Sequence, residues 1–246
     1  MREDRMEDEE QEREEGFSEP FTIASVEPDL KRRYRYLIYT EGREEPLLSV
    51  HEDILVRYRL FKGQLVEPGL AREIAAADVK HQAYVLAVGY LGAKPRTGKE
   101  LARYLKRKEL PPEAIESALE RLRREKLVDD EAYAKQFAEQ RLRNHLKGSR
   151  LIRQELLQRG VGREEAAEAL GSLDPEDERD AALRVARKKW PYLKGEGRER
   201  RQRLALFLAR RGYPAPVVRE TLKQVGETDG GRDDLDEPDD GHWLDN

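Results

Sequence analysis

The residues best suited to chemistry in this chain are arginines and lysines, which gather in a few short stretches. Arginine presents a planar fork of donors that suits bidentate contacts with phosphates and carboxylates. Cations along a helix can also bind a nucleic-acid backbone by releasing its counterions. We therefore predict a binding surface for a polyanionic or acidic partner, and a solvated charged surface without a partner is the alternative interpretation. The candidate residues are Arg141, Arg143, Lys147, Arg150, Arg153, Arg184, Arg187, Lys188, Lys189, Arg198, Arg200, Arg201, Arg210 and Arg211.

No combination of residues in the sequence indicates catalysis, so we expect a protein that is not an enzyme. The chain has no cysteine and no glycine-rich phosphate loop, and no serine lies in a nucleophile elbow. A catalytic role for His51, beside Glu52 and Asp53, is less consistent with the pattern than the start of a surface helix. The four histidines are scattered without the sequence spacing of metal ligands: His51, His81, His145 and His242. We therefore expect no cofactor and no metal site.

Charge is distributed unevenly along the 246 residues, and this supports the prediction of an anionic partner. The formal net charge is −4, but residues 21–223 carry +11, whereas residues 1–20 and 224–246 carry −7 and −8. A basic body favours acidic partners, although acidic ends that only increase solubility remain an alternative. No stretch approaches the roughly 18 apolar residues of a membrane span, and the acidic start lacks the apolar region of a signal peptide. We expect a cytoplasmic protein that does not contact a membrane.

A threefold repeat predicts the elements that position these cations. A repeat of about fifty residues is one helical unit that buries its apolar face partly against its neighbours. We predict a mainly α fold of tandem three-helix repeats in an elongated curved array, with a small N-terminal β-element. Six apolar positions recur with steps of 51 and then 52 residues: Leu101, Ile152 and Leu204; Leu105, Leu156 and Leu208; Leu110, Val161 and Tyr213; Ile115, Ala166 and Val218; Leu119, Leu170 and Leu222; and Leu122, Leu173 and Val225.

The same patterns divide the chain into six segments. We predict a disordered acidic N-terminus at 1–20, a β-rich region with a short helix at 21–67, repeats at 68–128, 129–173 and 174–226, and a disordered acidic tail at 227–246. The three predicted strands are FTIASV, RYRYLIYT and LLSVH, and the short helix lies in HEDILVRYRL.

Helix starts are predicted from residues whose side chains can accept hydrogen bonds from free backbone N–H groups. Thr97 and Glu100 have the spacing of a capping box. Asp129 and Asp130, whose negative charges suit the positive end of a helix, open the second repeat, and Asp174 and Pro175 open the third. Ser149 is the predicted cap of a further helix. We also expect the helix from Leu70 to Leu91 to break near Asp78.

Three segments of the chain resemble the RecX family of regulators of the RecA recombinase. They are YLGAKPRTGKELARYLKRK, LVDDEAYAKQFAEQRLRNHLKGSRLIRQELLQRGV and RQRLALFLARRGYPAPVVRETL, of which the second is the most specific. The resemblance extends over residues 21–225. The sequence departs from the family pattern at Lys108 and Glu109. At the equivalent position the second repeat has Gly160 and the third has Gly212.

The resemblance implies a regulatory protein that binds the RecA–DNA filament along its groove and inhibits the ATPase, recombinase and SOS coprotease activities of RecA. Some family members also bind DNA, so single- and double-stranded DNA are further candidate partners, and we expect a monomer. The alternative is a DNA-binding transcriptional regulator of the helix-turn-helix type, because AIESALERLRREKLVDDEAY is similar to a recognition helix followed by a wing. A wing requires a hairpin, however, and the residues after Val128 have a helical pattern.

Overall fold

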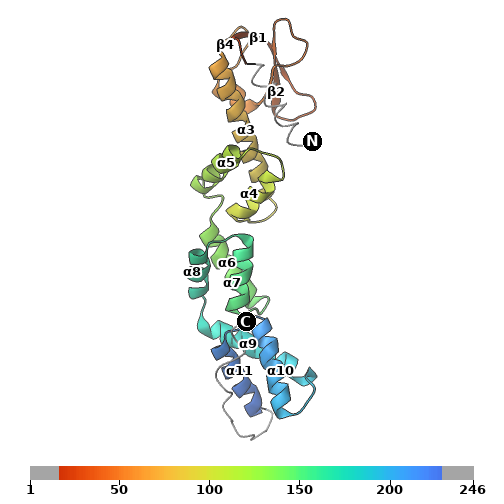
Figure 1. Cartoon of the computed structure of the whole chain (residues 1–246), viewed down its shortest axis with the longest axis vertical. Helices are drawn as coiled ribbons and strands as arrows, with labels where there is room; N and C mark the ends of the chain where they lie inside the picture. Colours follow the sequence, from red (N-terminus) through yellow and green to blue (C-terminus); the bar gives the residue numbers. More distant parts are fainter. Residues whose placement is uncertain (1–16, 229–246) are drawn as a thin grey trace. The chain divides into compact units, whose positions relative to one another are not determined.

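A computed structural model describes residues 17–228, which form two compact units (Figure 1). The first unit contains residues 17–95 and 101–128, and the second contains residues 96–100 and 129–228. The segments predicted to be disordered, 1–20 and 227–246, lie mostly outside the described residues. Within them, Phe17 is buried in the core of the first unit, and the last helix extends to Thr228.

A four-stranded antiparallel sheet begins the first unit, with the strand order β3-β2-β1-β4. Strands β1 (Phe21–Pro28), β2 (Arg35–Thr40) and β3 (Leu48–His51) correspond to the three predicted strands. The fourth, β4 (Leu65–Val66), was not predicted, because two residues are too few to show an alternating pattern. The predicted short helix is α2 (Glu52–Arg57), which follows β3 directly.

Helix α3 (Pro68–Leu91) is continuous, so the predicted break near Asp78 is wrong. The carboxylate of Asp78 is buried, but it accepts a hydrogen bond from the backbone N–H of His51 at 2.7 Å and pairs with Arg35 at 2.8 Å. A buried charge is tolerated where such partners compensate it. The helix can therefore pass through this position, and it contributes to two cores, with Ile74 against the sheet and Ala87 against the next two helices.

Tandem three-helix repeats follow the sheet, as predicted. The first repeat consists of α3, α4 (Gly98–Lys106) and α5 (Pro112–Arg124), and the second of α6 (Asp130–Arg143), α7 (Ser149–Arg159) and α8 (Arg163–Gly171). The third consists of α9 (Pro175–Lys189), α10 (Gly197–Arg210) and α11 (Ala215–Thr228), with a short 3-10 helix, η1 (Trp190–Tyr192), after α9. The strongest repeat positions are fully buried in all three copies: Leu101, Ile152, Leu204, Leu105, Leu156 and Leu208.

Most predicted helix starts are confirmed. Thr97 and Glu100 form the reciprocal capping box, with hydrogen bonds of 3.2 and 3.3 Å. The carboxylates of Asp129 and Asp174 each accept a backbone hydrogen bond of 2.9 Å in the first turn of the following helix. The predicted cap at Ser149 is wrong, because Gly148 is the N-cap residue of α7 and makes no side-chain capping bond.

Candidate functional site

The start of α7 contacts the turn between α10 and α11. The backbone N–H of Gly148 donates to the carbonyl oxygen of Arg211 at 2.9 Å, and that of Arg150 donates to Gly212 at 3.0 Å. A Cβ atom at Gly148 would collide with the backbone of Gly212, which itself has a positive φ of 88°. The two backbones therefore approach directly, and we call this contact the second joint.

The start of α4 makes an equivalent contact, the first joint, with the turn after α7. Both sides of it belong to the second unit. The hydroxyl of Thr97 donates to the carbonyl oxygen of Arg159 at 2.7 Å, and the backbone N–H of Gly98 donates to the carboxylate of Asp130 at 2.9 Å. The two joints have the same arrangement. In each, the N-terminus of the second helix of one repeat contacts a turn of the next repeat, and that turn directly follows the second helix of the next repeat.

Three predicted arginines belong to segments that contact one another at the second joint. Arg150 belongs to α7, Arg184 to α9, and Arg211 follows α10, and we call these three residues the joint cluster. Burial raises the pKa of Tyr213 to about 12. The positive charges of Arg211 and Arg184 act in the opposite direction, and the negative charge of Glu178 adds to the rise. The hydroxyl of Tyr213 donates to the carbonyl oxygen of Leu146 at 2.8 Å.

The guanidinium group of Arg211 is held by neutral acceptors. It donates to the carbonyl oxygens of His145 at 2.7 Å and Leu146 at 3.0 Å. Carbonyl oxygens satisfy its donors but do not cancel its charge. The second joint therefore contains both the positive charge of Arg211 and the carboxylate of Glu178, which accepts a hydrogen bond from the backbone N–H of Ser149.

Two other predicted cations share one acidic partner. Arg141 on α6 pairs with the carboxylate of Glu155 at 3.1 Å, and Lys147 contacts the same carboxylate. The guanidinium carbon of Arg141 also lies 4.6 Å from the ring centre of the buried Phe137. These contacts stabilise the α6–α7 connection and make the two cations less available to a partner.

Further predicted cations have structural contacts inside the third repeat or at its boundary. Arg143 pairs with Asp177 at 3.4 Å. The guanidinium of Arg200 lies 4.1 Å from the ring centre of Trp190 and donates to the carbonyl oxygen of the same residue at 3.1 Å. Lys189 lies over the ring of Phe207 at 5.5 Å, and Arg201 is half-buried on α10.

The remaining seven predicted cations have exposed side chains that make no ion pair within residues 17–228. Arg150 and Arg153 lie three residues apart and share one face of α7. Arg184, Arg187 and Lys188 have the same relation on α9. The structure therefore selects seven exposed, unpaired cations from the fourteen predicted residues: Arg150, Arg153, Arg184, Arg187, Lys188, Arg198 and Arg210.

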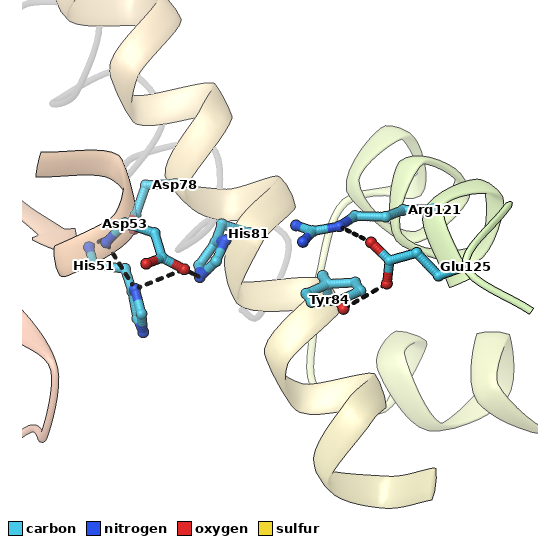
Figure 2. A network of polar contacts seen from close by, with 7 residues as sticks. All are labelled: His51, Asp53, Asp78, His81, Tyr84, Arg121 and Glu125. Atoms are coloured by element: carbon cyan, nitrogen blue, oxygen red, sulfur yellow. Dashed lines mark hydrogen bonds and ion pairs between the residues drawn. The ribbon is translucent and has the colours of Figure 1, made fainter. Parts of the chain in front are cut away.

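A polar network in the first unit was missed by the sequence analysis (Figure 2). The hydroxyl of Tyr84 on α3 donates to Glu125 at 2.6 Å, and Arg121 on α5 pairs with the same carboxylate at 2.8 Å. The guanidinium of Arg121 also lies 3.6 Å from the ring centre of Tyr84. The hydrogen bond to Glu125 raises the pKa of Tyr84, because the phenol must remain protonated to donate it. The hydrogen bonds from Tyr84 and Arg121 lower the pKa of Glu125, because both stabilise the ionised carboxylate.

Two histidines and an aspartate meet beside this network. The Nε2 atom of His81 lies 3.4 Å from the carboxylate of Asp53, and the Nδ1 atom of His51 lies 3.9 Å from the same oxygen. The two imidazole rings have centres 4.4 Å apart. Burial lowers the pKa of His81, and the proximity of His51 adds to this shift. The histidines are scattered in the sequence, as described above, but the fold brings His51 and His81 together from 30 positions apart.

None of the helices within residues 17–228 combines the length and apolar character needed to cross a membrane.

Three family models match this chain, one for each repeat. The first, second and third three-helix domains of RecX match residues 83–122, 129–170 and 176–222, respectively. Regulatory protein RecX of Limosilactobacillus reuteri is 34% identical over 204 residues, which are 82% of this chain and 76% of that protein. Regulatory protein RecX of Oceanobacillus iheyensis is 29% identical over 211 residues, which cover 84% and 78% of the two chains.

Solved structures agree with these matches. A crystal structure of a regulatory protein RecX has a TM-score of 0.71 and 32% identity, with 83% of this chain and 99% of that chain covered. The crystal structure of RecX from Lactobacillus salivarius, at 20% identity and a TM-score of 0.58, shares the fold over 61% of this chain. From its repeats, its sequence and its fold, the chain belongs to the RecX family of regulatory proteins.

Proposed function

We propose that this protein binds the filament that the RecA recombinase forms on DNA and inhibits the ATPase, recombinase and coprotease activities of RecA. Membership of a family of regulatory proteins supports a role in regulation rather than in catalysis. The single observation that carries the proposal is the set of exposed, unpaired cations on α7, α9 and α10. In our proposal the protein acts as a monomer in the cytoplasm, and no cofactor takes part in binding the filament.

The chemistry of the target favours the exposed, unpaired cations over those that are paired with a carboxylate. A filament on DNA presents phosphates and protein carboxylates, and arginine can contact both with two hydrogen bonds. Arg150 and Arg153 offer unpaired guanidinium groups, whereas Arg141 and Lys147 must first give up Glu155. We therefore assign the contact to α7 and α9, with the joint cluster between them, and propose that DNA phosphates contribute to the binding.

The helix-turn-helix alternative is not favoured by the fold. A wing would have to follow α5, but α6 begins at Asp130, six residues after α5 ends. Within residues 17–228, all four strands precede α3. A sequence-specific regulator would bind one duplex site far more tightly than random DNA, whereas our proposal predicts little sequence preference.

Titration into a RecA ATPase assay on single-stranded DNA tests the proposal directly. We expect inhibition by the wild-type protein. The double variant Arg150→Glu/Arg153→Glu should need a concentration at least about tenfold higher for half-inhibition, because like charges would face an anionic target. Both side chains are exposed, so the variant should retain the fold.

A matched control distinguishes the loss of specific contacts at α7 from a general effect of the changed net charge. Lys106→Glu/Arg107→Glu changes the charge by the same amount at two exposed positions at the end of α4. We expect its half-inhibitory concentration to stay within about twofold of that of the wild type. Equal losses in both double variants would remove α7 from the binding surface, and a wild-type protein without effect on RecA would overturn the proposed function.

A further inference from the structure

We propose that His51, Asp53 and His81 form a binding site for a divalent zinc-like cation in the first unit. The three residues come from adjoining parts of the fold, since His51 ends β3, Asp53 lies in the first turn of α2, and His81 lies in α3. Each offers one ligand atom, and these atoms all lie within 4.8 Å of one another. Figure 2 shows the carboxylate of Asp53 directed toward both imidazole rings.

An orphaned nitrogen points to a ligand at this position. The side chain of His81 exposes only 9% of its surface, and its Nε2 atom is buried without a hydrogen-bond partner within residues 17–228. The carboxylate of Asp53 lies 3.4 Å away, but it does not form a hydrogen bond with this nitrogen. Buried polar atoms without a partner are uncommon and costly, and a cation between the two groups would satisfy both.

The distances from Asp53 to the two histidines are close to those of tetrahedral coordination, and the ligand atoms of the two histidines, within 4.8 Å of each other, must move closer when a cation binds. Bond lengths near 2.0–2.1 Å place two tetrahedral ligands about 3.3 Å apart. The distance of 3.4 Å between His81 and Asp53 matches this value, and the 3.9 Å between His51 and Asp53 requires a small rotation of the exposed carboxylate. Two imidazoles and one carboxylate are a ligand set that zinc accepts, with a fourth position left for water.

The surroundings fix the backbone of the site. The backbone N–H of His51 is anchored by the buried carboxylate of Asp78 at 2.7 Å, and Asp78 is held in turn by Arg35. The Nδ1 atom of His51 now accepts a hydrogen bond from the backbone N–H of Asp53 at 3.2 Å, and a cation would take over that lone pair.

Arg121 on α5 also brings a positive charge near the site. Arg121 is close enough to act on His81, but it is paired with Glu125 at 2.8 Å. A bound cation would link α2 to α3, and so hold the β-rich region against the helix that continues into the first repeat.

Zinc chloride titrated into the full-length protein, purified without a histidine tag, tests the site by calorimetry. We expect one cation per chain, an increased melting temperature that a chelator reverses, and no response to Mg²⁺, which prefers oxygen ligands. Bound Co²⁺ should show the visible spectrum of tetrahedral nitrogen and oxygen coordination. In a histidine-labelled sample, zinc should shift the imidazole signals of His51 and His81 but not those of His145.

Two ligand variants and two matched controls decide the assignment. Asp53→Asn and His81→Gln should each weaken zinc binding by at least about tenfold, since even the loss of an outer hydrogen-bond partner costs that much. Asp53 is exposed, so its variant should fold even if His81→Gln does not. Glu52→Gln removes a neighbouring carboxylate of the same helical turn, and His145→Gln removes a histidine of the second unit.

Both control variants should bind zinc as the wild type does. Absence of binding at about 1 mM zinc, an Asp53→Asn variant with unchanged affinity, or an equal loss in Glu52→Gln would overturn the site. RecA is not part of these measurements, so their outcome is independent of the proposed function.

Discussion

The carboxylate of Glu178 on α9 accepts a hydrogen bond of 2.6 Å from the backbone N–H of Ser149, the first residue of α7. The third repeat thus supplies the cap that the second repeat lacks. Asp130 of α6 acts in the same way on Gly98, the first residue of α4. Each joint therefore combines a backbone approach with a carboxylate at the positive end of a helix, where negative charge is favoured.

The cap makes Glu178 a stabilising residue of the second unit. Glu178→Ala should lower the free energy of unfolding by about 1–2 kcal/mol, within the range measured when a helix cap is lost. Urea denaturation followed by the fluorescence of Trp190, which lies in this unit, measures the effect. Asp180→Ala removes an exposed carboxylate from the same helix and should stay within about 0.5 kcal/mol of the wild type. Equal effects of the two variants would contradict a specific cap.

Because two backbones approach each other directly at the second joint, we expect a single added methyl group to lower the stability of the second unit. Gly148→Ala should destabilise the second unit by about 1–3 kcal/mol, as overpacking does elsewhere, because the added Cβ meets the backbone of Gly212. Gly171→Ala is the control, since a Cβ at the end of α8 meets no atom within 4 Å and should be neutral or stabilising. The comparison uses the same urea denaturation. A Gly148→Ala variant as stable as the wild type would show that the joint can open without cost.

Burial of Tyr213 predicts a loss of stability at high pH. The pKa of its phenol is about 12 in the folded protein and 10 in the reference state, so the fold favours the protonated form. The raised pKa therefore contributes to the free energy of unfolding in full below pH 10, and this contribution is lost as the pH rises from 10 to 12. Tyr213→Phe should cost about 1 kcal/mol at pH 7, through the lost hydrogen bond to Leu146.

The pH dependence of the Tyr213→Phe variant distinguishes this effect from general alkaline unfolding. The variant cannot ionise at this position, so the difference in unfolding free energy between it and the wild type should shrink above pH 10. Chemical denaturation at several pH values between 7 and 11.5 measures that difference. A constant difference over the whole range would place the ionised phenol in contact with water.

We expect the acidic C-terminal residues to compete with DNA for the exposed cations. Residues 229–246 contain eight acidic residues and one basic residue, and they follow α11 in the chain. As a tethered competitor they would act at an effective concentration on the order of millimolar. Truncation after Thr228 should therefore strengthen binding to single-stranded DNA. Affinity for both proteins should fall steeply with salt, because bound cations release counterions. Superimposable binding curves in a salt series would show that these residues do not compete.

The sequence by itself determined the repeats and most of their helix starts. The register of Leu101, Ile152 and Leu204 is a pattern that repeats along the sequence. The capping box of Thr97 and the helix start at Asp129 depend on residues within one turn of each other. Helical periodicity and capping are local interactions, so they can be recognised without knowledge of the fold. The same local patterns gave the fourteen candidate cations and the resemblance that indicated the family.

Only the tertiary structure decided which groups meet across the chain. Glu178 lies 29 residues from Ser149, Asp78 lies 43 residues from Arg35, and His81 lies 30 residues from His51. Such partners leave no pattern in a single sequence, because their approach depends on how the helices pack. Packing therefore determined that α3 continues through Asp78, that Arg141 is paired while Arg150 is exposed, and that two distant histidines share one aspartate.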